Sequence, residues 1–497
     1  GEDFLVTARR KGRQIQGKNA SPTEISTYTH NKRLIVRPNW QHNRVRSQAL
    51  KMSVTSPKPP QSPPLETQTT VGNYFVSNYP PFSFWKTDFV DEVNSAMERA
   101  PAPDTTLGVY IHIPFCRKRC HFCYFRVYTD KNSSAIRNYL DASLSELELY
   151  ASKPFIGGRK PGFVYFGGGT PSYLSIDQLK YLTDGMKSHL PWDEVEEVTF
   201  ECEPGTLTDD KLQAIRDLGV TRLSLGVENF DDHILETNGR AHRSKEVGRA
   251  YEFARAVGFP QINIDLIAGM LEETEGNWME CVAKAIEMAP DSVTVYQMEI
   301  PYNTTIYKRM KDEGKLTAPV ADWETKRRWT DYAFNELQAA GYAISSAYTA
   351  VKDKMQTRFV YRDELWAGAD LLSLGVASFG HIGGVHYQNH HDFDPYVEKL
   401  ESGELPIYRA LTPNDDERLI REFVLQLKLG SLSIKYFKDK FGVDPNVRFS
   451  EPLKRIRDWG YLKIKGDTVT INRDGLLQVD RLLHEFFLPE HRNARYA

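Results

Sequence analysis

"LGVYIHIPFCRKRCHFC" (Leu107–Cys123) joins a short apolar run to a loop that holds three of the five cysteines in the chain. The run is nearly continuously apolar instead of alternating, which is typical of a parallel strand that is buried on both faces. The cysteines follow at once, with the spacing CxxxCxxC. The stretch therefore predicts a buried strand that ends in a sulfur-rich site.

Five similar runs follow, with helical stretches between them. They are "GFVYFGG" (162–168), "EVTFECE" (197–203), "RLSLGVE" (222–228), "QINIDLIAG" (261–269) and "SVTVYQME" (292–299). This repeat predicts an α/β fold, a partial or full (β/α) barrel, and not an open two-layer sheet. Barrels of this type carry their functional residues at the C-terminal ends of the strands.

The predicted helices have recognisable ends. Ser175 and Gln178 form a capping-box pattern at the start of one helix. Gly219, Gly258 and Gly341 each follow a helical stretch and precede an apolar run. Glycine is favoured at these positions because the residue after a helix often adopts a left-handed conformation.

The chain divides into five predicted parts. Residues 1–70 are expected to be a disordered arm, first basic and then Pro-rich, and residues 71–105 a lead-in. The barrel core is expected over 106–350 and a barrel-closing segment on the substrate side over 351–410. Three helical runs and a hairpin over 411–497 predict a winged-helix-like domain. Its bases are interleaved with acids, so we expect it to cover the substrate and not to bind nucleic acid.

The composition is that of an ordinary globular protein, with 26% charged residues and a net charge of −3. No apolar run reaches the roughly 18 residues that span a bilayer, so no membrane span is expected. An odd number of cysteines favours a reducing compartment, and we expect a cytoplasmic monomer. The Arg-rich leader could instead be an organellar transit segment, or sequence upstream of a natural start at Met52.

The cysteine loop can be compared with known metal sites. Structural zinc usually takes four N or S ligands. His112 and His121 could join the loop cysteines, but Cys202 and Cys281 have no partner at a suitable spacing. Three closely spaced thiolates fit a [4Fe–4S] cluster better than a zinc ion. Such a cluster normally takes four cysteine ligands, so three cysteines would leave one iron without a protein ligand. The fourth iron would then be open to a small molecule that chelates through amino and carboxylate groups.

"CRKRCHFC" resembles the signature of the radical S-adenosylmethionine (SAM) enzymes. With "GGGTPSYL", "RLSLGVENF" and "NIDLIAG", the chain from Tyr110 onward is similar to the HemN-like (oxygen-independent coproporphyrinogen III oxidase) family. The resemblance implies that Cys116, Cys120 and Cys123 hold a [4Fe–4S] cluster and that SAM chelates the open iron. Reductive cleavage of SAM would give a 5′-deoxyadenosyl radical.

The resemblance also implies SAM contacts, including a second SAM. The residues are Tyr110, Phe122, Gly168, Gly169, Thr170, Glu201, Glu228, Arg240, Asp265, Glu299 and Phe379. Glu201 could instead be a solvated acid at the barrel mouth. Asp265 lies in an apolar run and should have a partner, since an unpaired buried carboxylate is costly. Arg240 or Asp265 could also belong to a structural ion pair.

Three positions depart from the oxidase pattern: Phe125 replaces a fourth cysteine, Glu228 replaces a glutamine, and Glu299 replaces a small residue. Glu228 and Glu299 are therefore candidate catalytic residues. The leading hypothesis is a radical SAM enzyme of the coproporphyrinogen dehydrogenase type, acting on a tetrapyrrole-like substrate. The alternatives are a two-SAM C-methyltransferase for a bulky planar substrate and a haem-binding chaperone.

Two further groups of residues could bind a partner or ligand. His381, His386, His390 and His391 could ligate haem or bind substrate carboxylates, although such density can reflect loop composition alone. The cysteine loop also carries bases, namely Arg117, Lys118, Arg119 and Arg126. They could attract a flavodoxin- or ferredoxin-type electron donor or meet propionates, or they could be simply solvated.

Overall fold

The computed structural model describes residues 68–492 and 494, except 73 and 316. The predictions for the basic and Pro-rich arm lie almost entirely outside the described residues, because that arm was placed at 1–70. The described residues belong to one compact unit. Within these limits, no helix combines the length and the apolar character that crossing a membrane requires.

In the described part of the chain, twelve strands form one curved sheet, and its two outermost strands do not pair with each other. The parallel strands, in sheet order, are β9 (Asp370–Leu374), β1 (Leu107–Ile113), β2 (Pro161–Gly168), β3 (Glu197–Cys202), β4 (Arg222–Glu228), β5 (Gln261–Ala268) and β6 (Ser292–Gln297). The partial barrel is confirmed, and all six predicted strands are present as β1–β6. The sequence did not predict β9, which lies on the other side of β1.

Antiparallel strands extend both ends of the parallel sheet. Beyond β9 lie β10 (Phe379–Ile382), β11 (Val385–Asn389) and β12 (Ile407–Leu411), and beyond β6 lie β8 (Thr349–Val351) and β7 (Ala343–Ile344). These strands end the sheet on either side, so the barrel stays open.

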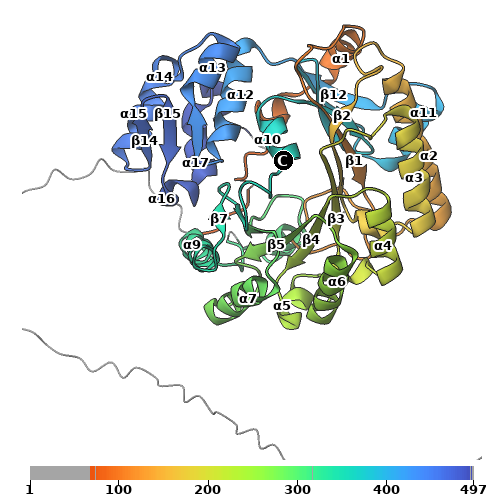
Figure 1. Cartoon of the computed structure of the whole chain (residues 1–497). Coiled ribbons are helices and arrows are strands. Elements are labelled where there is room, and N and C mark those ends of the chain that lie inside the picture. Colours follow the sequence, from red (N-terminus) through yellow and green to blue (C-terminus); the bar gives the residue numbers. More distant parts are fainter. Residues whose placement is uncertain (1–67, 73, 316, 493, 495–497) are drawn as a thin grey trace, which may run out of the picture. The chain divides into compact units, whose positions relative to one another are not determined.

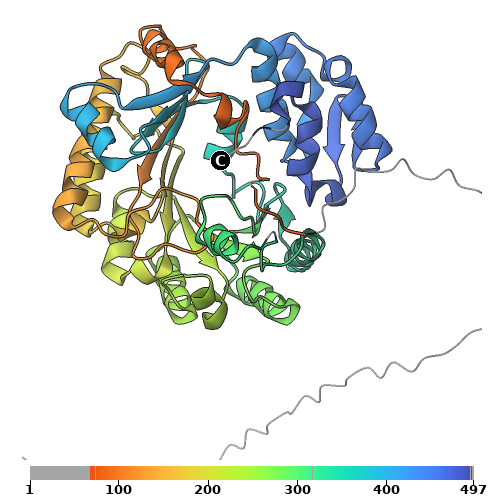
Figure 2. The ribbon, with the colours of Figure 1, turned by 180° about the vertical axis from the view of Figure 1, so that it is seen from behind.

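Helices cover the outer face of the sheet, as Figures 1 and 2 show from opposite sides. They are α1 (Val90–Met97), α2 (Ser133–Ala151), α3 (Ile176–His189), α4 (Asp209–Asp217), α5 (Asp232–Thr237), α6 (Ser244–Val257), α7 (Glu275–Met288), α9 (Trp323–Ala339) and α11 (Phe393–Glu401). Two helices lie elsewhere: α8 (Thr305–Asp312) lies at the cysteine loop, where the Ile306 N–H donates to the His121 carbonyl oxygen at 3.1 Å, and α10 (Val360–Trp366) lies inside the curve of the sheet, where Tyr361 packs against Tyr165. The capping box of Ser175 and Gln178 is present at the start of α3. Gly219, Gly258 and Gly341 have φ values of 95°, 81° and 93°, as the helix-end pattern predicts.

The C-terminal segment has its own hydrophobic core, in which Phe423 packs against Phe437 and Phe449. Its elements are α12 (Asp415–Leu427), β13 (Ser431–Ser433), α13 (Ile434–Phe441), α14 (Pro445–Arg448), α15 (Ser450–Asp458), β14 (Leu462–Lys465), β15 (Thr468–Ile471), α16 (Arg473–Leu476) and α17 (Val479–Leu483). The three predicted helices and the hairpin are therefore present. The sequence did not predict α17, which lies at the functional cavity described next.

Candidate functional site

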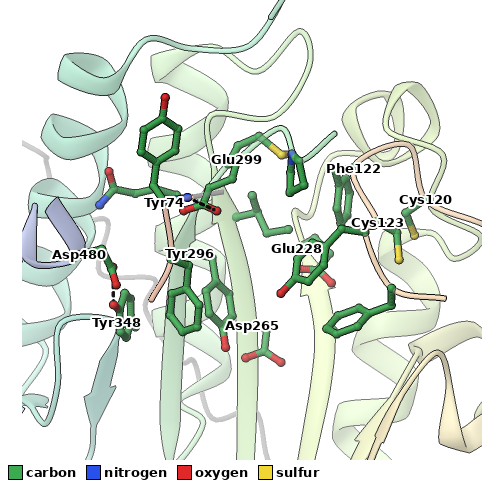
Figure 3. Close-up of a pocket in the computed structure, with 18 of the residues that line it drawn as sticks. Tyr74, Cys120, Phe122, Cys123, Glu228, Asp265, Tyr296, Glu299, Tyr348 and Asp480 are labelled. Atoms are coloured by element: carbon green, nitrogen blue, oxygen red, sulfur yellow. Dashed lines mark hydrogen bonds between the residues drawn. The ribbon is translucent and has the colours of Figure 1, made fainter. Parts of the chain in front are cut away.

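A cavity of about 960 Å³ lies at the C-terminal ends of the parallel strands. Its lining combines the cysteine loop after β1, the ends of the following strands, and residues of the C-terminal segment, as Figure 3 shows in part. A ligand here would contact residues that are hundreds of positions apart in the sequence.

The three loop cysteines line this cavity. Cys116, Cys120 and Cys123 are free thiols, of which Cys116 is buried and the other two are half-buried. The backbone holds the loop on both sides of the first cysteine. The Cys116 N–H donates to the Tyr128 carbonyl oxygen at 3.1 Å, and the Tyr128 N–H donates to the Pro114 carbonyl oxygen at 2.7 Å. The loop thus presents all three sulfurs to one space.

The surroundings of the thiols fit a cluster. Thr170 Oγ1 donates to Cys116 Sγ at 3.3 Å, and Arg240 Nη1 donates to Cys120 Sγ at 3.4 Å. Burial raises the pKa of Cys116 to about 11 and that of Cys123 to about 12, so ionisation here needs a compensating positive charge such as iron. No three His, Cys, Asp or Glu side chains in the described ranges surround a single ion position. A [4Fe–4S] cluster does not require such a single position, because each of its cysteine ligands binds a different iron atom.

The glycine-rich turn after β2 brings backbone close to the cysteine loop. Gly168 has a φ of 111°, and a Cβ there would lie 2.6 Å from the His112 ring. A Cβ on Gly169 would lie 3.0 Å from Cys116 Sγ and 2.9 Å from the Ile113 carbonyl oxygen. Only glycine lets the turn pack this closely on the cysteine loop, and both glycines line the cavity.

Glu201, at the end of β3, connects two neighbouring strands. Its Oε1 accepts a hydrogen bond from the Tyr165 hydroxyl at 2.6 Å, and its Oε2 accepts one from the Gly168 N–H at 3.2 Å. Burial, with the nearby charge of Asp265, raises the pKa of Glu201 to about 7. The carboxylate lines the cavity and retains lone pairs for a ligand.

Glu228, Arg240 and Asp265 form a second polar group in the cavity wall. Arg240 Nη1 lies 3.5 Å from Glu228 Oε1. The expectation that Asp265 has a partner is met, since Ser224 Oγ and Asn263 Nδ2 donate to it at 3.0 and 2.8 Å. Burial raises the pKa of Glu228 to about 7 and that of Asp265 to about 6. Glu228 also has a φ of 64°, an unusual conformation for a residue with a side chain.

Glu299 faces the C-terminal segment across the cavity, as Figure 3 shows. Its Oε2 accepts the Tyr74 N–H at 3.2 Å, and burial raises its pKa to about 8. On the other side, Asp480 accepts the Tyr348 hydroxyl at 2.5 Å and pairs with buried Lys428 at 2.9 Å. Lys428 and Tyr348 therefore hold the Asp480 carboxylate in the cavity wall.

The cavity lining does not include every residue that the sequence pattern predicted. The Tyr110 hydroxyl lies 3.0 Å from His112 Nδ1, and Phe379 packs against Phe82 and Trp85 at ring distances of 4.3 and 5.6 Å. The four clustered histidines are also absent from the lining: His381, His386, His390 and His391. Roles for these residues remain predictions.

Several lining residues were not predicted. Tyr165, Tyr296 and Tyr361 line the cavity, although in the sequence they are indistinguishable from aromatic core residues. Asp480 and Arg327 lie outside every recognised motif and reach the cavity only through the fold. No local signal could have identified them.

Comparison with known proteins gives one family model and many relatives. The model of the radical SAM superfamily matches residues 110–285. A protein named heme chaperone HemW from Mycobacterium tuberculosis is 31% identical over 310 residues, which cover 62% of this chain and 78% of that protein. A protein named oxygen-independent coproporphyrinogen III oxidase from Pseudomonas aeruginosa is 27% identical over 409 residues, covering 79% and 88%.

A solved structure has the same fold. Coproporphyrinogen III oxidase (HemN) from Escherichia coli, described as a radical SAM enzyme, matches with a TM-score of 0.72 and 23% identity. The match covers 84% of this chain and 99% of that chain. The common fold therefore includes the barrel and the C-terminal segment.

Proposed function

The chain belongs to the HemN-like family of the radical SAM superfamily, and we propose that it is an enzyme that oxidatively decarboxylates a tetrapyrrole-like substrate. Membership implies a [4Fe–4S] cluster and SAM, which supply one-electron radical chemistry when bound. One observation carries the proposal: a single cavity joins three thiols, a glycine-rich turn and buried carboxyl groups to a wide aromatic wall.

The residues of the barrel would hold the cofactors. Cys116, Cys120 and Cys123 would bind three irons, while Thr170 and Arg240 donate hydrogen bonds to two of the sulfurs. Hydrogen bonds of this kind stabilise thiolate charge and tune a cluster's potential. They also fix the sulfurs relative to the turn at Gly168–Thr170.

The carboxyl groups further along the sheet would orient SAM and substrate. Glu201 and Asp265 are held by hydrogen bonds from the protein, so their free lone pairs point in fixed directions. Glu299 accepts one backbone N–H and could hold or release a proton near neutral pH. The C-terminal segment lines this end of the cavity and would limit the access of water to a bound substrate.

The surface near the cluster would receive the electron donor. Tyr124 and Phe125 stack on each other and are 39% and 42% exposed. The same loop carries exposed Lys118 and exposed Arg126, which pairs with Asp392. We propose that an acidic protein of the flavodoxin or ferredoxin type docks here, because opposite charge steers such encounters. The replacement of a cysteine by Phe125 would then contribute an apolar contact.

A haem chaperone is the second candidate, favoured by the 31% identity with the protein named HemW. Such a protein would bind haem without turning over SAM. The size and the aromatic lining of the cavity suit either a porphyrinogen or haem. The two functions differ in whether SAM is consumed.

Reconstitution with iron and sulfide under anaerobic conditions, followed by dithionite, SAM and coproporphyrinogen III, separates the candidates. We expect 5′-deoxyadenosine and CO₂, both lost in Cys123→Ala. Cys281→Ala is the matched control, because Cys281 is a buried core thiol outside the cavity. S-adenosylhomocysteine would indicate methyl transfer instead, and stoichiometric haem uptake without SAM cleavage would contradict the enzyme and support the chaperone.

A further inference from the structure

Arg327 is an arginine without a counter-ion in the cavity wall. It lies on α9, is half-buried, and makes no hydrogen bond or ion pair with the part of the chain that the structure describes. Its guanidinium carbon lies 5.9 Å from the centre of the Trp323 ring. Its Nε is fully buried and has no acceptor. Buried polar groups almost always have partners, so an exception in a cavity points to a ligand.

A second cation lies on the same wall. Arg481, on α17, also lines the cavity. Burial lowers the pKa of Arg327, and the positive charge of Arg481 lowers it further. Two acids that line the cavity pair with cations other than Arg327: Glu485 with Arg455 at 2.5 Å, and Asp480 with Lys428 at 2.9 Å. Arg327 therefore carries its charge where burial and a second cation both disfavour it, and an anion bound beside it would offset that cost.

The wall around the two arginines is aromatic. Trp323 and Trp459 line the cavity, together with Leu477. The Trp323 ring meets the Tyr74 ring edge-on at 4.9 Å, which fixes its orientation. The ligand that fits here therefore carries an anionic group on a large apolar body.

We propose that Arg327 binds a carboxylate of the substrate and thereby places its apolar body along Trp323 and Trp459. The inference rests on the proposed function, in which the substrate is a tetrapyrrole with carboxylate side chains. The planar guanidinium suits a carboxylate, because it can donate two parallel hydrogen bonds.

Binding of coproporphyrin III, a stable tetrapyrrole with propionate side chains, tests this inference. Titration of the cluster-loaded full chain, followed by porphyrin fluorescence, is compared for the wild type, Arg327→Gln and Arg328→Gln. We expect Arg327→Gln to weaken binding about tenfold or more. Arg328 is the matched control, because its side chain is 52% exposed and lies 3.7 Å from Glu275 outside the cavity. Its substitution should leave the dissociation constant within about twofold.

Thermal unfolding of the same variants separates binding from folding. Arg327→Gln should melt at or above the temperature of the wild type without ligand, since it removes a repulsive charge that lacks a partner. A lower melting temperature would indicate a structural role and contradict the inference.

Three binding results would overturn the inference. Equal binding of coproporphyrin III by the wild type and Arg327→Gln would do so while leaving the proposed function intact. Weaker SAM binding with unchanged coproporphyrin binding would assign the carboxylate to SAM. Failure of the wild type itself to bind coproporphyrin III would overturn the proposed substrate as well.

Discussion

At the scale of single residues, the cavity keeps several groups in costly states. Glu228 has a left-handed backbone conformation at a strand end, and Arg327 is half-buried without a counter-ion. Strained or unpaired groups persist where function requires them, and they cluster at binding sites. Their gathering at one cavity supports its assignment as the functional site, independently of any motif.

Gly169→Ala tests whether the glycine turn makes room for the cluster. The added methyl group would meet Cys116 Sγ and the Ile113 carbonyl oxygen, so we expect iron and sulfide content after reconstitution to fall at least about twofold. Gly248→Ala is the control, because nothing lies within 4 Å of a Cβ there in α6. It should keep full iron content and gain about 0.5–1 kcal/mol of stability. Equal iron content in both variants would contradict the prediction.

Glu146 on α2 gives a prediction about pH. It is fully buried and accepts hydrogen bonds from Gly375 N–H, Tyr396 Oη and Asn389 Nδ2 at 2.8, 2.6 and 2.6 Å. Burial raises its pKa from 4.5 to about 7. The folded state therefore binds the proton more tightly than the unfolded state, so this contribution to stability is complete below pH 4.5 and is lost as pH rises through about 7.

The loss amounts to about 3 kcal/mol of unfolding free energy between pH 4.5 and 7. Urea unfolding at pH 5 and pH 8 measures it in the wild type and in Glu146→Gln. Other buried acids titrate in the same direction, so the difference between the two proteins isolates Glu146. An identical pH dependence in both would show that the carboxyl pKa is not raised.

At the scale of elements, β1–β6 could be predicted because strands buried on both faces leave nearly continuous apolar runs. β9 could not, since it has only five residues and the helix before it, α10, has only seven, which is too short for a clear period. Tyr165 shows the corresponding limit for the site. Its strand was predicted, but only the register of β2 against β3 determines that this tyrosine reaches Glu201. The cysteines, by contrast, were identified by spacing alone.

The buried pair of Glu197 and Arg222 joins α10 to the sheet. The side chains are 4% and 1% exposed and 3.0 Å apart, and Glu197 also accepts the N–H of Val360 at the start of α10. Glu197→Gln should cost about 3–5 kcal/mol, because it leaves a buried guanidinium without a counter-ion. Chemical denaturation measures the change. Asp458→Asn, in an exposed pair on α15, should change stability by less than about 0.5 kcal/mol. A similar loss of unfolding free energy in both variants would contradict the prediction that the buried pair matters more for stability than the exposed pair.

At the scale of the whole described unit, the cavity is closed by segments that are distant in sequence. Val76 N–H donates to Asp480 at 2.9 Å, and Lys428 donates to the Val76 carbonyl oxygen at 2.6 Å. The lead-in and the C-terminal segment therefore meet over the barrel mouth. Sequence patterns predicted each part, but Arg327, Asp480 and Arg481 become neighbours of the site only after the segments pack. The lining of the cavity depends on that packing, which is why the motif alone left three functions open.

The central claim is that SAM cleavage in this cavity acts on a tetrapyrrole. The most direct measurement uses coproporphyrinogen III deuterated on its propionate side chains, with reconstituted protein, dithionite and SAM under anaerobic conditions. We predict that mass spectrometry detects deuterium in 5′-deoxyadenosine, in proportion to the CO₂ released. Unlabelled 5′-deoxyadenosine with intact porphyrinogen, or no 5′-deoxyadenosine at all, would contradict the account.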